Sequence, residues 1–297
     1  MKKLLTVLVL AALVCSLSGC GIGFGGWDFG FGSTLVYDHA SKYTIGDGKV
    51  DGKVKNIDID WLSGSVSVVT GSGDSVVITE ATTGKIDKDM RVHWWLDGTT
   101  LRIKFCASGL KMRFNCGKKE LTVSVPESIN LSDISVDSAS GDVNVLDVNA
   151  EALRVDTASG DILVDTACEL REIRTDSASG DQSISVRNAQ AANLGASSGR
   201  ISVSADSIRR LHIDTASGNV RCDLQQEPDD CRIDTASGQV EVTLPEDAGF
   251  TMKLSTASGR LTSDFAMKKS GNTYVCGSGS GRLDIDTASG NISLIAM

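Results

Sequence analysis

The acidic and hydroxyl side chains of one recurring pentapeptide are the most prominent candidates for chemistry in this chain. It reads Asp214-Thr215-Ala216-Ser217-Gly218, and near-copies end at Gly141, Gly160, Gly180, Gly199, Gly238, Gly259 and Gly290. Aspartic proteases carry the related loop Asp-Thr-Gly, and two such loops bring together carboxylates that share a proton. Here an alanine interrupts the loop and six copies carry the aspartate. The pattern therefore favours a repeated structural turn over an acid–base pair, and no catalytic residue is predicted.

Carboxylates could also hold a cation if the copies stack. Aspartates about 4.8 Å apart repel one another. Turn N–H groups, the nearby arginines or a bound cation must offset that repulsion; the arginines are Arg154, Arg174 and Arg232. A calcium site among Asp142, Asp161 and Asp181 is an alternative, but the nonapeptides of calcium-binding β-rolls are absent. We therefore predict no metal or cofactor.

The three histidines give no further sign of a site. His39, His93 and His212 are far apart in the sequence and fit no HExxH or Ser-His-Asp spacing. His212 falls at an outward strand position and is expected to be solvated.

Cysteine chemistry is the next possibility. Six cysteines follow Cys20, and an even number in an exported protein allows disulfides. Cys106 and Cys116 flank an expected hairpin, and Cys222 and Cys231 occupy inward positions of consecutive repeats. Disulfides are possible within both pairs, and the alternative is that these cysteines are small buried hydrophobes. No CxxC pair supports a zinc site.

The residues around each glycine predict the elements that carry these side chains. Aliphatic residues recur seven and five positions before the glycine and two and four positions after it, for example Leu211, Ile213, Val220 and Cys222. Mostly polar residues stand between them. Strict alternation predicts two short strands per repeat, each with one buried face. The glycine supplies the backbone freedom that the turn requires.

One repeat cannot fold alone. About four buried aliphatic side chains contribute about 1.5–3 kcal/mol each, whereas ordering some twenty residues costs about 1–2 kcal/mol per residue. The repeats must therefore stack. We predict an all-β solenoid with about 20 residues per coil and parallel equivalent strands; a meander of antiparallel hairpins is the competing arrangement.

The N-terminus predicts export and anchoring. Lys2 and Lys3 precede an apolar run at residues 4–14, which is too short to span a bilayer. Leu17-Ser18-Gly19-Cys20 follows and resembles the bacterial lipobox. The resemblance implies cleavage before Cys20 and lipidation of its sulfur; the alternative is an ordinary secretory signal. We expect a lipid anchor on the extracytoplasmic face of the bacterial membrane or cell surface.

The charge restricts the partners. Without Lys2 and Lys3, 27 of the 29 basic residues remain against 38 acidic residues. Such an acidic protein is not expected to bind nucleic acid. A protein or an envelope or host glycan is the expected partner.

The chain divides into four parts. We predict a signal peptide at 1–19, a glycine-rich tether at 20–45, an irregular β region at 46–130 and the regular repeats at 131–297. Eleven of the fourteen aromatic residues fall before residue 133, so broader aromatic-containing coils are expected to cap the N-terminal end. The apolar end at 295–297 is expected to leave an open strand edge for self-association.

The leader motif, the approach at 42–47, the segment 57–64 and the recurring turn together resemble a bacterial family of β-strand-repeat proteins called "putative adhesins". The likeness covers residues 42–297. It implies a surface-exposed, non-enzymatic β-solenoid, and some relatives are associated with envelope-stress systems. The family offers no catalytic residues to transfer.

Three functions are consistent with these observations. A non-catalytic, adhesin-like binding scaffold is favoured by the anchor, the rod and the lack of a catalytic motif. An envelope-stress component that signals through a membrane partner is the alternative. A polysaccharide-active β-helix enzyme ranks last, because the outward charges are spread along the repeats instead of clustered.

Overall fold

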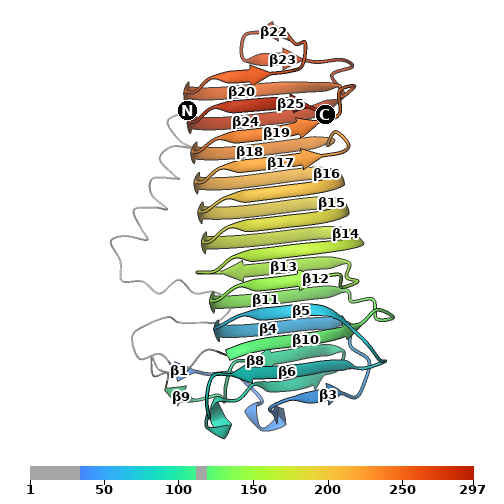
Figure 1. Ribbon diagram of the computed structural model, residues 1–297, viewed down its shortest axis with the longest axis vertical. Coiled ribbons are helices and arrows are strands. Elements are labelled where there is room, and N and C mark those ends of the chain that lie inside the picture. Colours follow the sequence, from blue (N-terminus) through green and yellow to red (C-terminus); the bar gives the residue numbers. More distant parts are fainter. Residues whose placement is uncertain (1–33, 112–118) are drawn as a thin grey trace.

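Residues on either side of the recurring glycine form the two faces of a flattened β-solenoid. The computed structural model describes residues 34–111 and 119–297, and successive rungs stack along its long axis (Figure 1). These residues contain no α-helix, only the short 3-10 helices η1 (Ala40–Lys42) and η2 (Lys88–Met90). None of their helices has the length and apolarity to cross a membrane. The all-β solenoid prediction is confirmed.

The pre-glycine face consists of parallel strands that end at or near the turn. In spatial order they are β8 (Thr100–Lys104), β4 (Asn56–Ser63), β11 (Asp133–Ser140), β13 (Ala152–Thr157), β14 (Ile162–Ser179), β15 (Gln182–Ser198), β16 (Ile201–Ser217), β18 (Asp230–Ser237), β24 (Gly281–Ser289) and β20 (Phe250–Ser258).

The post-glycine face consists of the strands that follow the turn. It contains β10 (Lys119–Pro126), β5 (Val66–Gly71), β12 (Val143–Leu146), the first parts of β14, β15 and β16, then β17 (Val220–Leu224), β19 (Val240–Leu244), β25 (Ile292–Ala296) and β21 (Leu261–Ser263). The long strands β14, β15 and β16 belong to both faces because each continues around the corner opposite the glycine turn.

Equivalent residues of successive repeats lie side by side. Ile213 pairs with Leu194 on one side and with Ile233 on the other, and all three are buried. The aliphatic columns therefore face each other across a narrow core. This arrangement confirms the parallel stacking and rules out the meander of hairpins for the repeats.

The turn glycines are required by close packing as well as by backbone conformation. Gly160 has a φ of 132°, a region that favours glycine. A β-carbon added there would lie 2.3 Å from the carbonyl oxygen of Gly141 in the preceding rung. Each glycine thus leaves room for the backbone of its neighbour.

The order of the rungs departs from the order of the sequence at the C-terminal end. β24 and β25 lie between β18–β19 and β20–β21, so the last repeat of the chain is inserted into the stack (Figure 1). The hairpin of β22 (Lys268–Ser270) and β23 (Thr273–Val275) covers the edge of β20. The prediction of an open strand edge at residues 295–297 is wrong because the last strand does not lie at the end of the stack. It pairs with β19 and, through residues 292–294, with β21.

The N-terminal half closes the other end with antiparallel strands. β7 (His93–Asp97) pairs with β8 and β2 (Thr44–Ile45), while β6 (Val76–Thr82) pairs with β10 and β3 (Gly48–Val50). The expected aromatic packing is present, since Trp61 and Phe105 are buried with ring centroids 4.9 Å apart. The broadening arises from these antiparallel strands and not from wider parallel coils.

The predicted tether needs a correction where it is described. Residues 34–45 include β1 (Thr34–Leu35), which pairs with β9 (Leu110–Lys111), and β2, which pairs with β7. They are therefore part of the N-terminal cap. Residues 20–33, which hold Cys20, lie outside the described residues.

Candidate binding face

Two columns of charged side chains run along the outside of the pre-glycine face. Within one strand, Arg154 Nη2 lies 2.6 Å from Asp156 Oδ2, and Arg174 Nε lies 3.0 Å from Asp176 Oδ2. Arg232 Nε donates to Asp234 Oδ2 at 2.7 Å. Arginine side chains, one of the options left open by the sequence, therefore offset the repulsion in the aspartate column.

The repulsion between aspartates is not fully compensated where the column lacks an arginine. Asp137 lies between Asp60 and Asp156 in the register of the sheet, and its own strand carries Ser135 at the arginine position. Burial, followed by the charges of Asp60 and Asp156, raises the pKa of Asp137 to about 6. This carboxyl is therefore half-protonated near pH 6.

The aspartates that follow the turn have a different role. Asp142 Oδ1 accepts the Asp161 N–H at 3.0 Å, and Asp161 Oδ1 accepts the Asp181 N–H at 2.8 Å. Asp181 Oδ1 accepts the Arg200 N–H at 2.7 Å. Each carboxylate thus accepts a hydrogen bond from the backbone of the next rung. This role differs from the calcium coordination considered as an alternative for these three aspartates.

His212 replaces arginine in the outer column. Its Nε2 atom lies 3.1 Å from Asp214 Oδ2 on the same strand and 3.8 Å from Asp234 Oδ2 on the next rung. The side chain points outward, as predicted, and it is half-exposed. The prediction of an outward, solvent-exposed histidine is confirmed, and its ring nitrogen also lies near two carboxylates.

A depression of about 620 Å³ opens on this face beside His212. It is lined by side chains of β14, β15, β16 and β18: Arg171, Glu172, Gln190, Ala191, Asn193, Arg210, Leu211, His212, Asp230 and Arg232. The central strand β15 has small side chains where its neighbours have long ones, since Ala191 pairs with Glu172 and Arg210, and Asn193 with Arg174 and His212. The depression follows from this local loss of side-chain volume.

The lining of the depression is basic in an acidic protein. Three arginines stand against Glu172 and Asp230. Arg171 lies 3.6 Å from Glu172, whereas exposed Arg210 forms no ion pair with any residue that the structure describes. Gln190 and Asn193 add amide donors and acceptors. Guanidinium groups bind carboxylates through paired hydrogen bonds, so the arrangement suits an anionic, hydroxyl-rich ligand.

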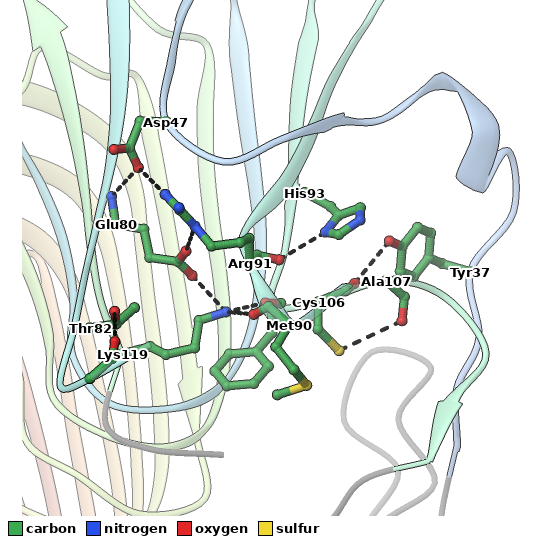
Figure 2. Close-up of polar contacts among 12 residues, drawn as sticks. Tyr37, Asp47, Glu80, Thr82, Met90, Arg91, His93, Cys106, Ala107 and Lys119 are labelled. Atoms are coloured by element: carbon green, nitrogen blue, oxygen red, sulfur yellow. Dashed lines mark hydrogen bonds and ion pairs between the residues drawn. The ribbon is translucent and has the colours of Figure 1, made fainter. Parts of the chain in front are cut away.

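A second polar cluster, centred on the buried side chains of Lys119 and Glu80, lies in the N-terminal cap (Figure 2). Lys119 Nζ lies 2.6 Å from Glu80 Oε1 and donates to the carbonyl oxygen of Met90 at 2.6 Å. It also lies 3.9 Å from the centroid of the Phe105 ring. Arg91 Nε donates to the other oxygen of Glu80 at 2.9 Å. Both Lys119 and Glu80 have fully buried side chains, so this ion pair belongs to the interior of the cap and not to the exposed face.

The predictions made for the cysteines differ in whether the structure tests them. Cys20 and Cys116 lie outside the described residues, so lipidation and the 106–116 disulfide stay predictions. Cys222 and Cys231 are buried and are present as thiols, not as a disulfide. Burial raises the pKa of Cys231 to about 12. They pack as small hydrophobes in this structure, which is the alternative weighed from the sequence.

The depression was not predicted from the sequence, although the sequence contains an indication of it. Gly195 breaks the aspartate column and Asn193 breaks the arginine column in the same repeat. A β-carbon at Gly195 would lie 2.1 Å from Asp176 Oδ1, so the neighbouring carboxylate occupies the space above this glycine. Reading the exceptions to the repeat could have indicated the place.

Comparisons with known proteins give structural neighbours of low identity. A "putative cell adhesion protein" from Clostridium sporogenes is 12% identical, with 86% of this chain and 100% of that chain covered and a TM-score of 0.32. A "putative adhesin" from Bacteroides fragilis is 16% identical, with 86% and 97% covered and a TM-score of 0.48. A "putative lipid binding protein" from Parabacteroides distasonis is 12% identical, with 84% and 96% covered and a TM-score of 0.46.

No curated protein matches the chain. The expected relationship to a β-strand-repeat family is confirmed by a family model, described as Toastrack DUF4097, that matches residues 54–295. This range includes the regular repeats and the N-terminal strands from β4 onward, and β1, β2 and β3 of the cap precede it. The protein belongs to the Toastrack DUF4097 family.

Proposed function

We propose that this protein is a non-catalytic binding scaffold that displays the pre-glycine face outside the cell, anchored by lipid at Cys20. Its ligand is an anionic glycan of the envelope or of a host, held in the depression between β14 and β18. The observation that carries the proposal is the depression lined by Arg171, Arg210 and Arg232 on an otherwise acidic chain.

The chemistry of the lining favours this ligand class. A carboxylated sugar offers a charge for Arg210, which has no ion-pair partner among the described residues, and hydroxyl groups for Gln190 and Asn193. The local basic charge also raises the concentration of anions near an otherwise repulsive surface. The rigid rungs hold these groups at fixed spacing, so little ordering is required on binding.

The full-length protein, purified in detergent, tests this proposal. Binding of polygalacturonate, a carboxylated polysaccharide, is compared with binding of neutral dextran by biolayer interferometry at low and moderate salt. We expect binding to polygalacturonate only, and a loss of at least tenfold in affinity for Arg210→Ala. Arg221→Ala is the matched control, because Arg221 lies on the post-glycine strand β17 and is paired with Asp223 and Glu241.

The comparison of these proteins tests whether the depression is the binding site. Equal binding by the wild type, Arg210→Ala and Arg221→Ala would show that the depression is not the site. Absence of polygalacturonate binding by the wild type would exclude carboxylated glycans of this kind as ligands. Both variants change exposed side chains, so neither is expected to disturb the fold.

A further inference from the structure

Three potential metal ligands lie close together on the outer face, at the edge of the depression that His212 also lines. His212, Asp214 and Asp234 each offer one ligand atom, and these atoms all lie within 4.8 Å of one another. Asp214 and Asp234 are register partners on β16 and β18, and His212 precedes Asp214 by two residues on the same face of β16. The cluster therefore depends on the stacking of two rungs.

The spacing of the ligand atoms fits a small divalent ion. Zinc binds histidine nitrogen and carboxylate oxygen at about 2.0–2.2 Å, so two ligand atoms of a tetrahedral site are about 3.4 Å apart. His212 Nε2 lies 3.1 Å from Asp214 Oδ2, which is close to that value, and 3.8 Å from Asp234 Oδ2, the oxygen that also accepts a hydrogen bond from Arg232. Binding of an ion would therefore require the Asp234 carboxylate to turn its Oδ1 atom toward His212.

Buried polar atoms without a hydrogen-bond partner among the described residues occur in this cluster, as they also do at Asp156 Oδ1 and Asp284 Oδ1 beside their arginines. The Asp234 residue is 7% exposed, and its Oδ1 atom has no hydrogen-bond partner among the described residues. His212 Nε2 lies 3.1 Å from Asp214 Oδ2, and it is likewise buried and makes no hydrogen bond of good geometry with the described residues. Buried polar atoms are normally satisfied, and in this cluster a bound cation would satisfy them.

The charges around the cluster also favour a cation. Asp286 follows Asp234 in the aspartate column, whereas Gly195 precedes Asp214 and brings no charge. The facing cation is Arg232, which binds Asp234 Oδ2 and leaves Oδ1 available. Three carboxylates against one guanidinium leave a net negative charge when His212 is neutral, the form that coordinates a metal.

We propose that His212, Asp214 and Asp234 form a binding site for one divalent transition-metal ion, with zinc as the best-fitting ion. The imidazole ligand distinguishes this site from one for calcium or magnesium, which prefer oxygen ligands only. Three protein ligands leave a fourth position for water or another ligand. The proposal does not depend on glycan binding, because its ligands and its test are separate from the role of Arg210.

A simple ion pair is the competing interpretation. In that case a protonated His212 bridges the two carboxylates, as arginine does in neighbouring rungs, and no metal is bound. The substitution His212→Arg separates the two interpretations. It recreates the Arg–Asp pair of β13 and β14, so the variant should fold, yet it cannot coordinate zinc.

The experiment measures zinc binding to the full-length protein in detergent after treatment with a chelator. Isothermal titration and metal analysis after gel filtration should give one high-affinity zinc per chain for the wild type. His212→Arg should weaken that binding by at least tenfold. Asp176→Asn, which changes the same column two rungs away where no histidine is present, should leave the affinity within twofold. Zinc should also raise the melting temperature of the wild type but not of His212→Arg.

Two results would overturn the proposal. One is a wild-type protein that retains no zinc, and the other is equal zinc affinity in the wild type and His212→Arg. The second result would assign the metal to other histidines or thiols of the chain. Melting curves in the absence of metal confirm that each variant is folded, so a loss of binding cannot be mistaken for unfolding.

Discussion

Gly218 lies so close to Gly199 in the preceding rung that a β-carbon on Gly218 would be 1.9 Å from the Gly199 carbonyl oxygen. The same contact recurs between the turn glycines of successive rungs, for example between Gly238 and Gly218 at 1.9 Å. The turn glycines therefore set how closely the rungs stack along one edge of the solenoid.

Gly218→Ala should consequently destabilise the protein by about 2–3 kcal/mol, because the rungs must separate to accept the methyl group. Chemical denaturation followed by circular dichroism measures this loss. Ser204→Ala, an exposed position on the same strand β16, should change the free energy of unfolding by less than about 0.5 kcal/mol. Similar stabilities for the two variants would contradict the close stacking.

Substitutions at inward and outward positions of β16 should differ sharply in how much stability they remove. Ile213→Asp places a charge in the core, where Ile213 is fully buried, and should cost several kcal/mol, about 3–5. His212→Asn, one residue away on the outer face, reproduces Asn193 of the preceding rung and should cost less than about 1 kcal/mol. Melting temperatures in the absence of metal provide the comparison, and equal losses would reverse the assignment of the faces.

The raised pKa of Asp137 predicts a pH dependence. Its pKa rises from 3.8 to about 6 in the folded protein, so the folded state binds this proton more tightly than the unfolded state. The stabilising contribution is fully present below about pH 4 and is lost as the pH rises through about 6. Asp137→Asn should therefore raise stability at pH 8 by on the order of 1 kcal/mol, allowing for solvent screening of this partly exposed group.

The check is the difference in melting temperature between Asp137→Asn and the wild type from pH 4 to pH 8. This difference should grow with pH through the range around 6. A difference that stays constant with pH would show that the aspartate column does not perturb Asp137. Asp165→Asn, on the post-glycine part of β14, is a suitable control for the loss of one negative charge.

The buried ion pair of the cap should be sensitive to the loss of one partner. Glu80→Gln removes the negative charge of Glu80 from the buried ammonium of Lys119 and should cost about 3–5 kcal/mol. Arg174→Gln removes one partner of the exposed pair with Asp176 and should cost less than about 1 kcal/mol. Denaturant midpoints distinguish the two, and a small effect for Glu80→Gln would mean that water reaches the cluster.

Much of the fold could be predicted because each repeat contains the residue pattern that determines its own strands and turn. Alternation around Ile213 and Val220 separates the buried faces from the exposed faces, and the recurring glycine marks the turn between them. These are local properties, since side-chain direction in a strand alternates with every residue. Equal repeat lengths then led to parallel stacking of equivalent residues, as observed for Ile213 and Ile233.

The order of the rungs and the contacts between them were decided only in three dimensions. Similar rungs accept one another almost equally well, so alternation cannot specify that β24 enters between β18 and β20. The same limit applies to the outer face. His212 and Asp234 are 22 positions apart and meet only because β16 and β18 stack in register, and the depression exists only because the small side chains of β15 lie between longer ones. The amino-acid sequence by itself determined which side chains face the core, whereas the tertiary structure decided which outward side chains became neighbours, because a strand sets the direction of its side chains and packing alone sets its partners.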